Sequence, residues 1–131
     1  MNAGVYNDIN VSNKRLNVAK SDALDVTSFP QYQLTGKEEL DKYLVGCVRN
    51  IGGEAYKFVS PGNAGVPDRI VIMPGGGVWF VELKCHNKKL RPLQRSQHLK
   101  LLDFGITTHV LDSREGIDDF VHYVLQEHPL E

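Results

Sequence analysis

Residues 67–84 read PDRIVIMPGGGVWFVELK, and this stretch decides the fold. Two β-rich runs, 69–73 and 78–84, flank the turn PGGG, which is typical of a hairpin. Side chains two apart on a strand project from the same face, so Glu82 and Lys84 lie together. A central strand between helices should be apolar throughout, and a buried charge is costly unless it is paired or binds metal. Glu82 therefore needs a partner.

The register of this hairpin decides whether Asp68 is that partner. If Met73 paired with the residue after the three glycines, Asp68 would face away from Glu82. A register shifted by one residue, with Met73 opposite Gly77 and a glycine-rich bulge at the turn, places Asp68 opposite Glu82. We predict the shifted register, and with it a pair of neighbouring carboxylates.

Two carboxylates a few Å apart repel each other unless a cation lies between them. Oxygen ligands at this spacing suit Mg²⁺ or Mn²⁺, which retain waters and can bridge to a phosphate. Such an ion activates water and stabilises charge on phosphoryl oxygens, while Lys84 would orient or activate the nucleophile. The pattern predicts phosphodiester hydrolysis. The structural alternative is that Glu82 and Lys84 form a surface ion pair on an edge strand.

The whole chain has the composition of one globular domain. It holds 131 residues, of which 41% are apolar and 24% charged, with a net charge of −1. No apolar run approaches the ~18 residues of a membrane span, and the start of the chain lacks the apolar centre of a signal peptide. We expect a cytoplasmic protein without a membrane partner. Two cysteines are too few for a disulfide framework, so reduced thiols are expected.

Residue periodicity predicts an α/β fold with the order α-β-β-β-α-β-α, a mixed sheet flanked by helices. Residues 1–35 show no regular pattern and are predicted to form an arm that is disordered or contacts a partner subunit. Residues 36–131 form the domain. Besides the two hairpin strands, we expect a helix from 37 to 51, a strand over 55–59, a helix from 92 to 104, a strand over 106–111 and a final helix capped by Ser113.

Basic residues gather directly after the predicted site. Residues 84–100 hold six Lys or Arg and no acid, whereas residues 103–131 hold seven acids and one Arg. Such a band binds a phosphate backbone with little sequence preference, although a solvated helix face is the alternative. His86 and His98 are interpreted as polar surface residues. The candidates for nucleic-acid contacts are Lys57, Ser60, Lys88, Lys89, Arg91 and Arg95.

Three segments, SPGNAGVPDRIV (60–71), PGGGVWFVELK (74–84) and KKLRPLQRSQ (88–97), resemble the motifs of the VRR-NUC domain. This family is a branch of the PD-(D/E)XK nuclease superfamily, which has a restriction endonuclease-like core. The resemblance covers about residues 37–125. It implies that Asp68, Glu82 and the Leu83 carbonyl are metal ligands, that Lys84 is the catalytic lysine, and that Gln94 supports the site or contacts a phosphate.

The first predicted helix departs from the family pattern, because Lys37 stands where members usually carry a glutamate. Glu38, Glu39 and Asp41 lie nearby. On a helical wheel Asp41 is the acid nearest to the core direction, so it is the candidate for the supplementary metal ligand. A solvated carboxylate favoured by the helix dipole is the alternative for all three acids.

These observations predict a Mg²⁺- or Mn²⁺-dependent endonuclease acting on branched or duplex DNA. No base-reading module is recognised, so we expect selection of DNA structure. One site cuts one strand, which favours a C2 homodimer. By resemblance, Holliday-junction resolution or nicking and a phage origin, hence the host cytoplasm, are expected. The alternatives are a catalytically silent nucleic-acid-binding subunit that keeps this fold, and a metal phosphohydrolase for small nucleotides.

Overall fold

A computed structural model describes residues 36–127, and within them the elements follow the predicted order. Residues 1–35, where we predicted an arm, and residues 128–131 lie outside the described part of the chain. The elements are α3 (Lys37–Asn50), β1 (Glu54–Lys57), β2 (Arg69–Ile72), β3 (Val78–Leu83), α4 (Pro92–Asp103), β4 (Thr108–Leu111) and α5 (Arg114–Glu127).

The strands are shorter than predicted, and the difference lies at their ends. β1 stops at Lys57, although the Phe58 amide still donates to the Asp68 carbonyl at 2.9 Å before the chain turns away. β4 starts at Thr108 because the chain first leaves α4 through Gly105, whose positive φ of 87° ends the helix. At the other end of β4, Ser113 caps α5 as expected, accepting the Gly116 amide at 3.0 Å.

The four strands form one mixed sheet in the order β1-β2-β3-β4. The β1–β2 and β2–β3 pairs are antiparallel, and β3 and β4 are parallel. Ile72 pairs with Val78, and the Met73 amide donates to the Gly77 carbonyl at 2.9 Å. The shifted hairpin register is therefore confirmed. One step beyond the last paired residues, it places Asp68 opposite Glu82.

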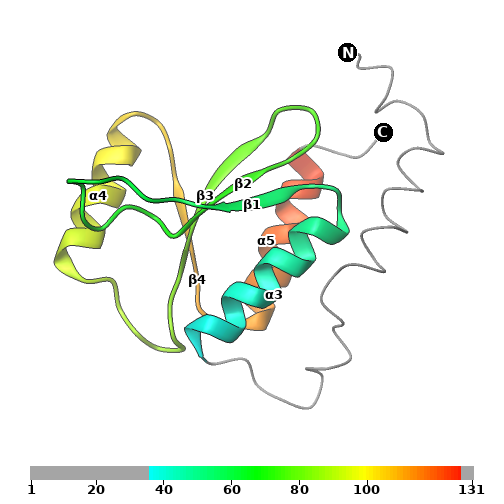
Figure 1. Ribbon diagram of the computed structural model, residues 1–131, viewed down its shortest axis with the longest axis horizontal. Coiled ribbons are helices and arrows are strands. Elements are labelled where there is room, and N and C mark those ends of the chain that lie inside the picture. The colour runs from blue at the N-terminus through cyan, green and yellow to red at the C-terminus, as the bar shows by residue number, and fades with distance from the viewer. Residues whose placement is uncertain (1–35, 128–131) are drawn as a thin grey trace.

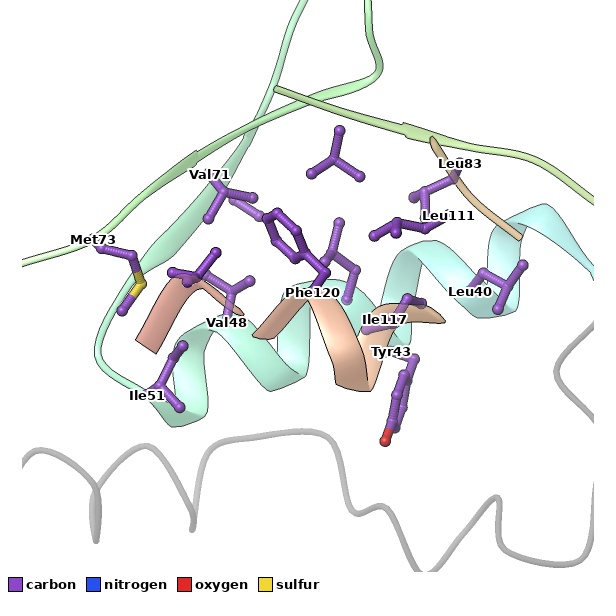
Figure 2. Close-up of a cluster of buried hydrophobic side chains, with 14 residues drawn as sticks. Leu40, Tyr43, Val48, Ile51, Val71, Met73, Leu83, Leu111, Ile117 and Phe120 are labelled. Carbon is purple, nitrogen blue, oxygen red and sulfur yellow. The ribbon is translucent and has the colours of Figure 1, made fainter. Parts of the chain in front are cut away.

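Helices lie on both sides of this sheet, with α3 and α5 together on one side and α4 on the other (Figure 1). The apolar core fills the space between the sheet and the α3–α5 pair, where side chains of both helices meet those of β2, β3 and β4 (Figure 2). Val71, Val81 and Leu83 point into this core and are fully buried. Because side chains alternate along a strand, Glu82 points to the opposite side of β3, towards α4.

Helix α4 contributes nothing to the apolar core. Leu93, Leu99 and Leu102 are each more than half exposed, and Gln94 is the one buried residue of α4. The helix lies where the sequence predicts it, but the side it turns to the sheet is polar. In the described residues, no helix is both long enough and apolar enough to span a membrane.

Candidate active site

Asp68 and Glu82 meet at the open end of the β2–β3 hairpin. Glu82 is fully buried on β3, and Asp68 directly precedes β2. The Leu83 amide donates to Oδ2 of Asp68 at 3.0 Å, which fixes this carboxylate against the neighbouring strand. Lys37 Nζ lies 3.1 Å from Asp68 Oδ2 and 3.9 Å from Glu82 Oε2. One ammonium group thus joins the two acids that the sequence predicts to converge.

Gln94 holds Glu82 from the side of α4. Its Nε2 donates to Oε2 of Glu82 at 2.8 Å, and its Oε1 accepts the backbone amide of Arg91 at 2.9 Å. Gln94 stands in the first turn of α4, so this contact ties the carboxylate to the start of the helix. The structure therefore places Gln94 at the predicted site.

The environment of Glu82 favours its protonated form. Burial, together with the nearby charge of Asp68, raises the pKa of Glu82 to about 7. The positive charges of Lys37 and Lys84 act in the opposite direction and favour the carboxylate. Glu82 is therefore a carboxyl group whose charge depends on the cations around it.

Lys84 is the second of these cations and follows β3 directly. Its side chain is largely buried, with the residue 8% exposed, and its amide donates to the Leu111 carbonyl at 3.0 Å. That bond continues the parallel pairing with β4 and keeps Lys84 on the same side of the sheet as Glu82. A buried lysine whose charge acts on Glu82 can also neutralise charge that develops on a phosphoryl group.

The donor set at the hairpin fits a hard divalent cation. Oε1 of Glu82 is buried and has no hydrogen-bond partner in the structure, so one carboxylate oxygen is unused. Within residues 36–127, no three His, Cys, Asp or Glu side chains gather into a complete metal site. Mg²⁺ commonly takes only one or two carboxylates and completes its shell with water and phosphate. Asp68 and Glu82 therefore fit such an ion, whereas a closed structural metal site is not formed.

Asp41, the predicted supplementary ligand, is paired with an arginine. Its Oδ1 accepts from Arg69 Nε at 2.9 Å and its Oδ2 from Arg69 Nη2 at 2.7 Å. Asp41 lines the same cleft as Asp68, but to bind a metal one of its oxygens would have to leave Arg69. Its role as a ligand stays a prediction. Glu38 and Glu39 are exposed on the first turn of α3.

Sequence reasoning missed two residues at the site, Lys37 and His98. The His98 side chain is only 11% exposed, and its Nε2 lies 3.9 Å from Oε1 of Glu82. Burial lowers the pKa of His98. The prediction of a surface position was therefore wrong for His98, while His86 is exposed as expected. Gln94 and His98 are four residues apart and so share a helix face, which is the signal that could have found His98.

The predicted nucleic-acid contacts fall into two groups. Lys57 lines a cleft of about 510 Å³ beside Asp68, and Ser60 lies in the loop that follows it, where its hydroxyl accepts from Asn63 Nδ2 at 2.8 Å. The second group is exposed at and before the start of α4 and comprises Lys88, Lys89, Arg91 and Arg95.

Comparison with known proteins assigns this arrangement to a family. A curated protein named "Putative nuclease p44", from Acyrthosiphon pisum secondary endosymbiont phage 1, is 47% identical over 83 residues, which are 63% of this chain and 89% of that protein. A solved structure described as a VRR_NUC domain matches with a TM-score of 0.61 and 32% identity, covering 71% of this chain and 96% of its own. The chain belongs to the VRR_NUC family.

The structural match also confirms the expected fold of the domain. The mixed sheet and the order α-β-β-β-α-β-α agree with the VRR_NUC domain. No protein-family profile matches the chain. In this VRR_NUC protein the acids at the hairpin, the lysine after β3 and the glutamine of α4 therefore stand on the framework of a nuclease family.

Proposed function

We propose that this protein is a divalent-metal-dependent endonuclease that hydrolyses phosphodiester bonds in DNA. The observation that carries the proposal is the convergence of Asp68 and Glu82, with Oε1 of Glu82 buried and unused. Neighbouring carboxylates with a free oxygen are what a hard cation needs to bind both the protein and a phosphate. The nuclease name of the phage relative agrees with this chemistry.

Two acids and two further candidate ligands would bind the metal ion. Asp68 and Glu82 would hold Mg²⁺ or Mn²⁺, with the Leu83 carbonyl and Asp41 as the further candidate ligands. When bound, such an ion supplies Lewis-acid activation of water and charge stabilisation at the phosphate.

Lys84 acts on the phosphate, and Gln94 acts on the carboxylate of Glu82. Lys84 neutralises charge on the phosphoryl oxygens and orients the attacking water. Gln94 keeps Glu82 in one orientation through its 2.8 Å hydrogen bond, which is how a supporting residue maintains a ligand in its productive position.

The exposed cations give this site a path for the DNA backbone. Lys57 stands in the cleft beside Asp68, and a second group of exposed cations lies at the start of α4, the helix that supports Glu82. Contacts from lysine and arginine to phosphates supply affinity without reading sequence. The cations at the start of α4 are Lys88, Lys89, Arg91 and Arg95. We therefore infer that the enzyme selects branched DNA structure, with junction resolution or nicking as the activity.

Cutting both strands of a duplex or a junction requires two sites. We infer a C2-symmetric homodimer, because residues 36–127 of each chain carry one such site and a symmetric pair of sites would face the two antiparallel strands. The phage relative agrees with action in a host cytoplasm. Size-exclusion chromatography with light scattering, with and without a four-way junction, tests this part of the proposal by counting subunits.

A cleavage panel tests the reaction itself. Supercoiled plasmid, four-way junction, flap, duplex and single strand are incubated with Mg²⁺, with Mn²⁺ or with EDTA. We expect cleavage that EDTA abolishes, that is greatest on the junction, and that is lost in Asp68→Asn, Glu82→Gln and Lys84→Ala. Glu115→Gln and Lys42→Ala remove exposed charges of the same types elsewhere and should cut normally. Absence of cleavage of every substrate by folded, metal-loaded wild-type protein would overturn the proposal.

One observation favours a second candidate, a catalytically silent DNA-binding subunit. Lys37 already neutralises the two acids, which would make metal unnecessary for their burial. In that case the protein binds the junction in a salt-dependent manner and does not bind Mn²⁺. Neither the wild type nor any variant then cleaves the DNA. The same panel, combined with a binding assay in EDTA, separates the two functions.

A further inference from the structure

Lys37 takes the position at which a cation would bridge the two acids. Its Nζ lies 3.1 Å from Oδ2 of Asp68 and 3.9 Å from Oε2 of Glu82, although these residues stand in three different elements or loops. Lys37 therefore supplies the counter-charge that two neighbouring acids require.

The ammonium group is held electrostatically but is not enclosed. The Lys37 side chain is 42% exposed and borders the cleft beside Asp68, whereas Glu82 is fully buried. Ion pairs that involve an exposed lysine contribute little net stability, because the flexible lysine side chain regains entropy and hydration when it leaves the carboxylate. A divalent ion carries twice the charge and loses no side-chain entropy on binding.

We propose that Lys37 is an internal counter-ion that holds Asp68 and Glu82 together in the metal-free protein and leaves them when a divalent cation binds. This inference rests on the proposed metal-dependent function. It assigns Lys37 a positioning role, because the carboxylates of Asp68 and Glu82 keep their positions without metal. The affinity for metal is lower as a result, since the metal must displace the ammonium group.

Isothermal titration with Mn²⁺ on the full chain tests the competition. We expect Lys37→Gln to bind Mn²⁺ about twofold to fivefold more tightly than the wild type, as removal of a weak competing ion pair should give. Lys37→Arg keeps a cation at this position and should bind Mn²⁺ like the wild type. Lys42→Gln removes a charge from the exposed side of the same helix and controls for net charge. Its affinity for Mn²⁺ should be unchanged.

A measurement on the unmodified protein tests the displacement directly and does not depend on the folding of a variant. Acetic anhydride acetylates free lysine amines, and mass spectrometry of the digested protein gives the rate at each lysine. An amine held by two carboxylates reacts slowly. We expect saturating Mn²⁺ to accelerate acetylation of Lys37 several-fold while Lys42, in the same sample, reacts at a constant rate.

The outcomes separate this inference from the proposed function. Tighter Mn²⁺ binding by Lys37→Gln together with faster acetylation of Lys37 supports the displacement. Mn²⁺ binding that is equal in the wild type and Lys37→Gln, with acetylation unchanged, overturns the displacement but leaves the metal-dependent nuclease in place. Absence of Mn²⁺ binding in both proteins overturns the displacement and the metal dependence together.

Discussion

The side chain of Gln94 connects Glu82 to the start of helix α4. Its Nε2 donates to the Glu82 carboxylate at 2.8 Å, while its Oε1 accepts the Arg91 amide at 2.9 Å. Both ends of one amide are used, so the orientation of Glu82 and the position of the helix depend on each other. The apolar core has no part in this contact.

Gln94→Ala should damage both activity and stability. The substitution leaves a buried carboxylate oxygen without its donor and removes the bond to Arg91. Loss of a residue that supports a metal ligand typically lowers activity about tenfold to hundredfold. We expect this loss in kcat/KM for junction cleavage and a decrease of about 1–2 kcal/mol in the free energy of unfolding. Urea unfolding measures the second quantity. Gln97→Ala, on the same helix, should change neither, and an equal effect of both variants would contradict the prediction.

Gly65 sets how closely the loop before β2 approaches α4. It has a φ of 95°, and a Cβ added there would collide with the Leu93 carbonyl oxygen and would lie 2.9 Å from the Gln94 amide nitrogen. Gly65→Ala should therefore displace the start of α4, with a cost of about 1–3 kcal/mol in unfolding free energy and a loss of cleavage activity.

Gly62→Ala is the matched control for Gly65→Ala. Gly62 also has a positive φ, of 81°, but nothing lies within 4 Å of an added Cβ. Gly62→Ala should lose only about 1 kcal/mol of unfolding free energy, which is the cost of a positive φ for alanine, and should keep full activity. If the two alanine variants unfold at the same urea concentration, the close contact between Gly65 and α4 does not determine stability.

Metal binding should appear as thermal stabilisation. A ligand that binds only the folded protein raises stability by about 2.7 kcal/mol at a concentration one hundred times its Kd. We expect Mn²⁺ to raise the Tm of the wild type, EDTA to reverse the shift, and Glu82→Gln to show none, because its amide is a weaker ligand than a carboxylate. The shift should be retained in Glu115→Gln. A shift of equal size in Glu82→Gln would place the bound ion elsewhere.

His109 should make the fold sensitive to mild acid. Its ring packs against Phe120 and Tyr123 at centroid distances of 5.0 and 5.5 Å, and burial lowers its pKa. The unfolded chain takes up a proton at this residue below a pH of about 6.5, whereas the folded chain does so only at lower pH. This contribution to stability is complete above that pH and is lost as the pH falls.

His109→Phe should reduce the loss of stability between pH 7.5 and pH 5, because phenylalanine keeps the ring contacts and cannot bind a proton. Urea unfolding at several pH values measures the slope. His86→Phe, at an exposed position, should have the slope of the wild type. If His109→Phe also keeps the wild-type slope, His109 does not govern the acid sensitivity.

The sequence predicted the acid pair because its geometry is local. The three glycines between β2 and β3 fix the register, and the register alone brings Asp68 opposite Glu82. The element order follows from periodicity in the same way. Strand ends were misplaced by one or two residues, since pairing stops where the chain turns away and not where β-branched residues end.

The hairpin register does not place Lys37 and His98 beside the acids, because their contacts with Asp68 and Glu82 depend on how α3 and α4 dock on the sheet. A lysine in the first turn of α3 reaches the acids only through the angle of that helix to the sheet. For α4, the leucines at 93, 99 and 102 are exposed, and the helix turns Gln94 and His98 to the sheet. Tertiary packing overrides the local pattern where a polar network is formed.

The position of the acid pair within a single hairpin has a consequence for the order of folding. Closing a short loop loses little chain entropy, so contacts within a hairpin form early. On the ribosome, α3 and this hairpin leave the exit tunnel before α4 and β4 do. During that interval Gln94 cannot yet donate its hydrogen bond to Glu82, but Lys37 is already outside the tunnel. We therefore expect the nascent chain to neutralise its acids with a residue that precedes them.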